Sequence, residues 1–382
     1  MRLLITLKIS NDKTMKIAII GTRGYPYVYS GYETFVSELA PRLTNAGHQI
    51  YVYCHKSLFK SYPKVVNGIN LVYLPAIERK SLSQFTHSFL STIHAIFKNY
   101  DILLYVNSAN GPFGFLTKLF KRKTAINVDG LEWLRPKWKG LGSKYYYWAS
   151  KLSTRLFDMV ISDSTEMAKI YKKEFNADSV TIAYGANIGY SENGNMIKQF
   201  NLKKNEYYLI VGRLIPDNNA DLIVKGFCAS NSNKKLVIVG DVPYNDSYAE
   251  NIRKVNDERI VFTGYVRDSE LLKELYCNAY VYIHGHEFGG TNPTLLKALA
   301  CGTPILALNT VFSKEILVNG EYGFFFEKNK SSLTTRIEEI DSQNGFLDCF
   351  RTKNRKRILE KYTWDIITEQ YITLFNKMYK NN

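Results

Sequence analysis

Long apolar runs, paired cysteines and internal repeats are all missing from this chain of 382 residues. No stretch approaches the roughly 20 apolar residues that a helix needs to cross a bilayer. The five cysteines are scattered and form no C-x-x-C pair, which excludes a disulfide framework and gives no support to a cysteine zinc site. A reducing cytoplasm is therefore the compartment that fits best.

The amino terminus lacks the features of a cleaved leader. Its apolar stretch is short, and no small-residue cleavage site follows it. A strand pattern opens at Met15-Lys16, so either Met1 or Met15 is a candidate start.

Acidic residues are scarce relative to basic ones, with 35 Asp and Glu against 50 Lys and Arg, for a net charge of +15. Such a surplus indicates an anionic partner: nucleic acid, a membrane surface or a phosphorylated substrate. Between Lys118 and Arg155, ten basic residues are opposed only by Asp129 and Glu132, and three tryptophans and three tyrosines are interleaved with them. This segment could bind single-stranded nucleic acid, lie on anionic lipid headgroups, or form a solvated face over an aromatic core.

Short apolar segments recur along the chain, many of them ending in glycine or a small polar residue. They are continuous rather than alternating, which is typical of parallel strands whose two faces are both covered. Helical patterns lie between them, at 33–45, 81–98, 268–278, 294–301 and 362–379. Two successive sets of alternating strands and helices predict an α/β chain with two doubly wound domains. The segments include KIAIIG at 16–21, DILLYVN at 101–107, YYLIVG at 207–212 and AYVYIHG at 279–285.

The domain limits follow from this pattern. We expect a first domain over 15–190 and a second over 207–361, because the stretch 186–206 is polar, rich in asparagine and glycine, and weakly periodic. The last helix, within 362–380, could belong to the second domain or cross back onto the first.

Two loops carry the residue types of an anion site. The first strand runs into Gly21-Thr22-Arg23-Gly24-Tyr25-Pro26, and Ser30-Gly31-Tyr32-Glu33 then opens a helix. Glycines at such a turn let backbone N–H groups approach an anion at the helix N-terminus. The spacing is not G-x-G-x-x-G, so a dinucleotide site is only weakly indicated, and the glycines could simply form the turn.

The second loop reads H-G-H-E-F-G-G-T-N-P over 284–293 and follows a predicted strand. Thr291 or Asn292 suits the N-cap of the next helix, and Pro293 suits its first position. The loop should therefore direct a helix N-terminus, Glu287 and two histidines into the crevice beyond the strand's carboxyl end, where ligands bind in such folds. Each histidine alone could equally be a structural residue.

Four motifs together resemble one known family. G-T-R-G-Y-P, D-G-L-E-W at 129–133, V-G-R-L at 211–214 and the 284–293 loop are similar to bacterial polysaccharide glycosyltransferases of family 4, above all the rhamnosyltransferase-like group of capsule and O-antigen biosynthesis. The resemblance spans nearly all of 15–380. It implies the GT-B fold, with two Rossmann-like domains facing a cleft and the nucleotide-sugar held mainly by the second. It also implies catalysis without a metal or other cofactor.

The resemblance assigns roles residue by residue. Arg213 matches the diphosphate-binding arginine, and Asn218-Asn219 stand where the broader family has a lysine. Lys297 stands where a ribose-binding glutamate is usual, and could supply phosphate charge or be a surface lysine. The implied catalytic residues are Glu287, Asp129 and Glu132; the donor-binding residues are Arg213, His286, Gly289, Gly290, Thr291, Asn292, Lys297, Gly21, Arg23 and Gly31; the acceptor-binding residues are Glu33, Trp133 and Arg135.

The resemblance predicts an enzyme that moves a sugar, with L-rhamnose from dTDP-L-rhamnose as the first guess, onto a lipid-linked oligosaccharide. The expected partners are the nucleotide-sugar, this acceptor and an anionic membrane surface, without nucleic acid. The enzyme would be cytoplasmic and peripheral on the inner face of the cell membrane. A nucleotide-sugar epimerase on the same fold and a basic nucleic-acid-binding protein are the alternatives.

Overall fold

A computed structural model describes residues 13–26, 31–79, 82–136, 138, 140–191, 194–242, 246–343 and 345–380. The choice between Met1 and Met15 as the start is therefore untested. Ser30 of the first loop and two basic residues of the 118–155 segment, Lys137 and Lys139, also lie outside the described residues.

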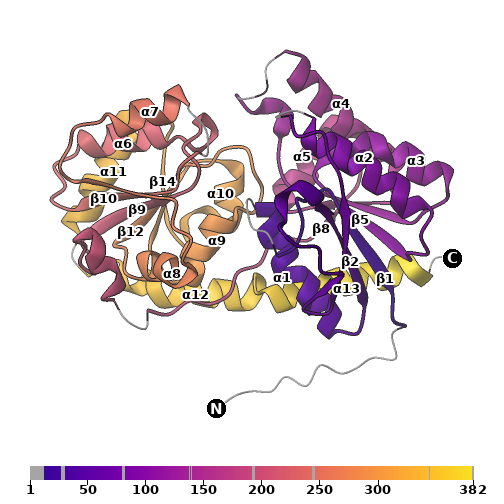
Figure 1. Cartoon of the computed structure of the whole chain (residues 1–382). Helices are drawn as coiled ribbons and strands as arrows, with labels where there is room; N and C mark the ends of the chain where they lie inside the picture. Colours follow the sequence, from indigo (N-terminus) through magenta and orange to yellow (C-terminus); the bar gives the residue numbers. More distant parts are fainter. Residues whose placement is uncertain are drawn as a thin grey trace.

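The first half of the chain forms one twisted sheet covered by helices on both faces (Figure 1). Its strand order is β3-β4-β2-β1-β5-β6-β7-β8, and the strands run parallel except for the β3–β4 pair. The strands are β1 (Lys16–Ile20), β2 (Gln49–His55), β3 (Val65–Val66), β4 (Ile69–Leu74), β5 (Ile102–Val106), β6 (Thr124–Val128), β7 (Met159–Ser162) and β8 (Val180–Thr181). The helices are α1 (Gly31–Asn45), α2 (Ser83–Ile96), α3 (Gly114–Leu119), α4 (Leu141–Leu156) and α5 (Thr165–Phe175).

The second half forms a separate parallel sheet with the order β11-β10-β9-β12-β13-β14. Its strands are β9 (Tyr207–Val211), β10 (Lys235–Val239), β11 (Ile260–Gly264), β12 (Val281–His284), β13 (Ile305–Leu308) and β14 (Phe324–Phe326). Its helices are α6 (Ala220–Cys228), α7 (Ser247–Arg253), α8 (Ser269–Cys277), α9 (Pro293–Ala300), α10 (Val311–Ile316), α11 (Lys330–Ser342) and α12 (Asp348–Lys361). The two-domain α/β architecture expected from the continuous apolar segments is confirmed.

The chain crosses between the domains twice, and the two crossings pair with each other. Ala186 N donates to Tyr362 O at 2.7 Å, and Ala186 forms a parallel bridge with Thr363. The helix expected over 362–379 begins two residues later, as α13 (Trp364–Lys380), because Tyr362 and Thr363 take part in this pairing. The last helix is thus separated from α12 at the point where the chain passes between the domains.

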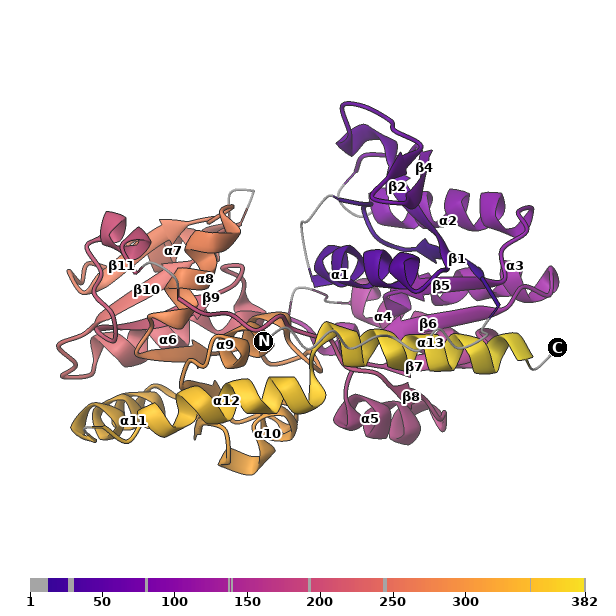
Figure 2. The ribbon, with the colours of Figure 1, turned by 90° about the horizontal axis from the view of Figure 1, so that it is seen from below.

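Helix α13 runs back along the first domain, next to α1 (Figure 2). Asn127 Nδ2 at the end of β6 donates to the Tyr371 hydroxyl at 3.0 Å, and Lys123 Nζ donates to Tyr379 O at 3.2 Å. The last helix therefore belongs to the core of the first domain although the chain reaches it from the second.

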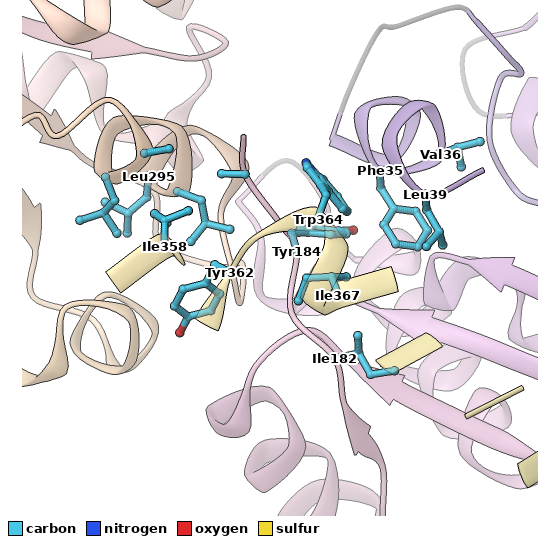
Figure 3. Packing of buried hydrophobic residues seen from close by; sticks show 14 of the residues in the cluster. Phe35, Val36, Leu39, Ile182, Tyr184, Leu295, Ile358, Tyr362, Trp364 and Ile367 are labelled. Atoms are coloured by element: carbon cyan, nitrogen blue, oxygen red, sulfur yellow. The ribbon is translucent and has the colours of Figure 1, made fainter. Parts of the chain in front are cut away.

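One hydrophobic cluster is shared by the two domains (Figure 3). Phe35 of α1 packs against the rings of Tyr184, Trp364 and Tyr371, and Leu295 of α9 belongs to the same cluster. Helix α9 of the second domain and helix α1 of the first domain therefore share one hydrophobic core. None of the helices in the described part of the chain combines the length and apolarity that a bilayer crossing requires.

Candidate active site

The first loop is fixed by a close approach of main chains. Gly21, directly after β1, has φ +104°, and a Cβ there would lie 2.5 Å from Val106 O. Only glycine fits this turn without strain. Further along the loop, Arg23 N donates to Glu33 Oε1 at 2.9 Å, so the buried Glu33 side chain ties the loop to α1. The structure thus brings Gly21, Arg23 and Glu33 together.

The second loop ends in a capped helix, as the sequence predicts. Asn292 Oδ1 accepts a hydrogen bond from Thr294 N at 2.9 Å, and Pro293 is the first residue of α9. A Cβ on Gly31, the first residue of α1, would lie 3.7 Å from Pro293. The N-termini of α1 and α9, one from each domain, therefore face each other, and both carry the partial positive charge of a helix start.

Between these helix starts, the two domains meet along a short backbone seam. Gly289 forms an antiparallel bridge with Gly130, and Leu131 N donates to Phe288 O at 3.0 Å. Thr291 Oγ1 donates to Asp163 O at 2.8 Å and accepts from Tyr184 N at 3.0 Å. The loop before α9 therefore joins the carboxyl ends of β6 and β7 to the second domain. We call residues 288–291 with their first-domain partners the interdomain seam.

A small pocket lies beside the seam at the carboxyl ends of β9 and β12. Its lining includes Gly212, Arg213, Asn218 and His286. The His286 ring stacks on His284 with centroids 4.7 Å apart. Burial lowers the pKa of His284 to about 3, and burial together with the charges of Arg213 and Arg135 holds the pKa of His286 well below its usual range. Both rings are neutral at physiological pH, so the positive charge at the pocket comes from arginine.

Glu287 is held by two groups that sequence reasoning did not connect with it. Lys328 Nζ lies 2.6 Å from Glu287 Oε2, and Asn219 Nδ2 donates to the same oxygen at 3.4 Å. Asn219 also donates to Gly285 O at 2.8 Å, and Asn218 Nδ2 donates to Arg213 O at 2.8 Å. The asparagine pair therefore fixes the two loops around the pocket. Lys328 lies 41 positions along the chain from Glu287, in a stretch with no recognisable motif.

Across the cleft, the segment after β6 holds two carboxylates. Asp129 accepts hydrogen bonds from the hydroxyls of Tyr32 and Tyr184, the latter at 2.7 Å. Desolvation raises the pKa of Asp129, and the two tyrosines oppose that rise. Glu132 accepts from Trp138 Nε1 at 3.0 Å and forms an ion pair with Arg135 at 3.0 Å. A carboxylate whose pKa is raised toward neutrality suits a proton acceptor.

Asp163, at the end of β7, is a buried carboxyl group that sequence reasoning did not select. A Cβ on Gly290 would lie 1.8 Å from Asp163 Oδ1. Desolvation and then the charge of Asp129 raise the pKa of Asp163 well above its usual range, and Glu315 adds to this. The nearby Thr291 backbone and Ser164 hydroxyl act in the opposite direction. Among the described residues, neither Asp163 carboxylate oxygen has a hydrogen-bond partner. The Asp163 carboxyl is therefore easier to protonate than an exposed aspartate.

Of the expected site residues, only Arg213 and His286 line this pocket, and two of the others, Trp133 and Lys297, pack against aromatic rings. Trp133 is 8% exposed, and its ring packs edge-on against Tyr171 and Phe175 in the first-domain core. Lys297 Nζ lies 5.9 Å from the centroid of the Tyr276 ring, and burial lowers the pKa of this lysine. Trp133 as an acceptor ligand and Lys297 as a phosphate ligand stay predictions. Among the described residues, no three His, Cys, Asp or Glu side chains are grouped to hold a metal ion.

This architecture and site define a class of protein: two facing parallel-sheet domains with a basic pocket in one and carboxylates in the other. Residues 29–186 match the model described as Glycosyltransferase Family 4, and residues 193–357 match Glycosyl transferases group 1. The two models together match most of the chain, which belongs to the GT-B glycosyltransferases.

Relatives and solved structures agree with this assignment. The uncharacterized glycosyltransferase MJ1607 of Methanocaldococcus jannaschii is 25% identical over 61% of this chain and 63% of its own length. The capsular polysaccharide biosynthesis glycosyltransferase CapM of Staphylococcus aureus is 22% identical over 50% of this chain and 52% of its own length. The chain thus spans less than two thirds of each of these two relatives.

Two solved structures share the fold over nearly all of the chain. Sucrose-phosphate synthase from Thermosynechococcus elongatus superposes with a TM-score of 0.80 at 20% identity, covering 96% of this chain and 100% of that one. Anabaena Alr3699/HepE in complex with UDP and glucose superposes with a TM-score of 0.76 at 14% identity, covering 95% and 100%. At these identities the likeness establishes the fold alone.

The seam makes a steric prediction. Gly290→Ala places a methyl group against Asp163, so the seam must separate, and we expect a loss of about 1–3 kcal/mol in unfolding free energy, as for other overpacked sites. Gly289→Ala is the matched control, because its Cβ would lie 3.7 Å from Asp129 O, an ordinary contact. Thermal unfolding and small-angle scattering measure the two effects. If Gly290→Ala changes neither the melting temperature nor the radius of gyration, the close contact of Gly290 with Asp163 in the seam is wrong.

Asp163 makes a pH prediction. Because the pKa of Asp163 is raised in the folded protein, its proton binding favours folding below the unfolded pKa of about 4, and this contribution is lost as the pH rises through the folded pKa. Asp163→Asn keeps the shape without the charge. At pH 8 this variant should have a higher melting temperature than the parent. The gain in unfolding free energy should be about 1.4 kcal/mol for each unit of pKa shift, and it should vanish toward pH 4. Asp178→Asn, whose side chain is 89% exposed, is the control and should show no such trend. A gain that is the same at both pH values would refute the assignment.

Proposed function

We propose that this protein transfers a sugar from a nucleoside diphosphate to an acceptor hydroxyl, with the donor in the second domain and the acceptor in the first. The observation that carries the proposal is the juxtaposition across the seam. The pocket beside Arg213 and the N-terminus of α9 lie on one side, and Asp129 and Glu132 lie on the other.

The donor side suits the leaving group. Glycosyl transfer develops negative charge on the departing diphosphate, and a planar guanidinium can bind two phosphate oxygens at once. The partial positive charge at the start of α9 adds a preorganised dipole at the same place. Glu287, held between Lys328 and Asn219, is proposed to face the transferring sugar.

The acceptor side suits proton removal. The attacking hydroxyl must lose its proton as the new glycosidic bond forms, and a positioned carboxylate can accept it. Asp129 is the stronger candidate, because two tyrosine hydroxyls orient it and desolvation raises its pKa. Glu132, already bound to Arg135 and Trp138, is proposed to orient the acceptor.

The donor and acceptor are proposed from the family resemblance and the relatives. The motif resemblance favours dTDP-L-rhamnose, whereas the HepE structure was solved with UDP and glucose, so both nucleotides belong in the test. The relative CapM is named for capsular polysaccharide biosynthesis, which is consistent with a saccharide acceptor. The motif resemblance is what favours an oligosaccharide linked to lipid at the inner face of the membrane.

A donor panel tests the proposal. The protein is incubated with dTDP-rhamnose, UDP-glucose and GDP-mannose and a lipid-linked acceptor, and nucleoside diphosphate release is measured. Glu287→Gln should lower kcat at least about 100-fold while leaving diphosphate affinity near normal, because the lost contact acts on the sugar. Arg213→Ala should weaken diphosphate binding by about 1.5–3 kcal/mol, the range for a charged hydrogen bond. No turnover with any donor and no binding of any nucleoside diphosphate would refute the function.

A membrane contact is the second part of the proposal. Helices α2, α3 and α4 lie on one side of the first domain (Figure 1) and expose large apolar side chains there. Leu119 is 66% exposed, Phe97 71%, Phe115 63% and Trp148 51%. Lys118, Lys121 and Lys144 are exposed on the same helices or directly beside them. We call these seven residues the aromatic–basic face. Apolar groups that insert among headgroups, flanked by lysines that attract anionic lipid, suit a bilayer surface.

Charge reversal tests this contact. Lys118→Glu, Lys121→Glu and Lys144→Glu combined should release the protein from liposomes containing anionic lipid, since each lysine contributes about 1 kcal/mol near such a surface. Activity on a short water-soluble acceptor should survive. The control reverses Lys225 and Lys356 of the second domain and Lys203, which lies just before it; all three are at least 66% exposed, and the variant has the same net charge. Lys123 is left intact because it binds the end of α13. If the two triple variants bind liposomes equally well, the aromatic–basic face is not the membrane-binding surface.

A further inference from the structure

Arg135 connects the two domains at the donor pocket. It follows the short helix Glu132–Leu134 of the first domain, and its side chain is 17% exposed. Its Nε lies 3.0 Å from Glu132 Oε1, and its Nη1 lies 3.7 Å from Asp217 Oδ2. Asp217 belongs to the second domain, in the turn Pro216–Asn218. The guanidinium therefore stands between an acceptor-side carboxylate and a donor-side carboxylate.

The turn that holds Asp217 borders the donor pocket. Asn218, the next residue, lines that pocket together with Arg213 and His286. Arg213 lines the pocket, whereas Arg135 does not, but the charges of both arginines oppose protonation of His286. The Arg135 guanidinium, from the first domain, therefore lies near enough to the pocket for its charge to act there.

The terminal nitrogens of Arg135 are available to a ligand. A separation of 3.7 Å is an ion pair but too long for a hydrogen bond. Within the described ranges, neither Nη1 nor Nη2 donates a hydrogen bond to another residue. A Cβ on Gly130 would lie 2.9 Å from Nη2, so this nitrogen lies beside the Gly130–Gly289 bridge and the loop that precedes α9. The Nη1 and Nη2 atoms of the Arg135 guanidinium can therefore still donate hydrogen bonds at the place where the two domains meet.

We propose that Arg135 is the second cation of the donor diphosphate subsite, reaching from the first domain to the phosphates held by Arg213 and the start of α9. The proposal rests on the proposed function and deepens it, because it places in the donor site a residue that the family resemblance assigns to the acceptor. Its consequence is that a diphosphate bridges the two domains. Nucleotide binding and closure of the seam are then coupled, because the two arginines can bind one diphosphate together only when the seam is closed.

The test compares nucleotides with one and two phosphates. The parent protein is titrated by calorimetry with UDP, dTDP and GDP, and the tightest binder is carried forward with its monophosphate. Arg135→Gln should weaken the diphosphate at least tenfold, or about 1.4 kcal/mol, and the monophosphate less than threefold. Arg336→Gln removes an arginine from an exposed ion pair on α11 and is the matched control, with both affinities unchanged.

A second variant separates ligand binding from a structural role. If Arg135 only neutralises Asp217, then Arg135→Gln combined with Asp217→Asn should restore the diphosphate affinity. If Arg135 binds the diphosphate, the double variant stays at least tenfold weak while its melting temperature returns to that of the parent.

Other outcomes overturn the proposal or the function beneath it. Unchanged diphosphate affinity with a raised KM for the acceptor would place Arg135 in the acceptor site. Equal losses for the monophosphate and the diphosphate would also refute the proposal. Binding of no nucleoside diphosphate by the parent protein would refute the proposed function itself, which is a different result from normal binding that ignores Arg135.

Discussion

The interdomain seam is the constraint on which the site depends. Gly290 fits because only a hydrogen atom separates its backbone from the Asp163 carboxyl, and the Thr291 hydroxyl bonds to main-chain groups on both of its first-domain neighbours. The same turn leads directly into α9. The position of that helix N-terminus relative to Asp129 therefore follows from the seam, so one backbone contact sets the distance between the donor pocket and the acceptor carboxylates.

Different interactions bury apolar surface between the two domains and fix how the domains are oriented. The shared cluster around Phe35, Trp364 and Leu295 supplies apolar contact between the domains, and such contact is strong but tolerates sliding. The pairing of Ala186 with Tyr362 and Thr363, where both chain crossings meet, is directional. The shared cluster therefore supplies burial between the domains, and the paired crossings fix the direction in which the chain passes from one domain to the other.

The positive charge of the chain is divided between two environments. On the aromatic–basic face the lysines are exposed, where water and salt screen them. In the cleft, Arg135 is enclosed between Glu132 and Asp217, and Lys328 pairs with Glu287. Enclosed charges need partners, because their desolvation is costly. The net charge of +15 therefore overstates the positive potential of the cleft, where carboxylates match the cations closely.

The sequence by itself determined the strands, the helices and part of the site, because these features depend on interactions between residues close together in the chain. Continuous apolar segments predict covered parallel strands, and the Asn292-Pro293 pair predicts where α9 begins, because capping and strand burial depend on residues near in the chain. Tertiary structure alone decided that Asp163 meets Gly290, that Lys328 holds Glu287, that Trp133 turns into the core and that Arg135 reaches Asp217. Each of these contacts joins segments far apart in the chain or sets the side to which a ring points. They depend on which strand ends share a sheet edge and on how the two sheets face each other, and no local periodicity encodes either.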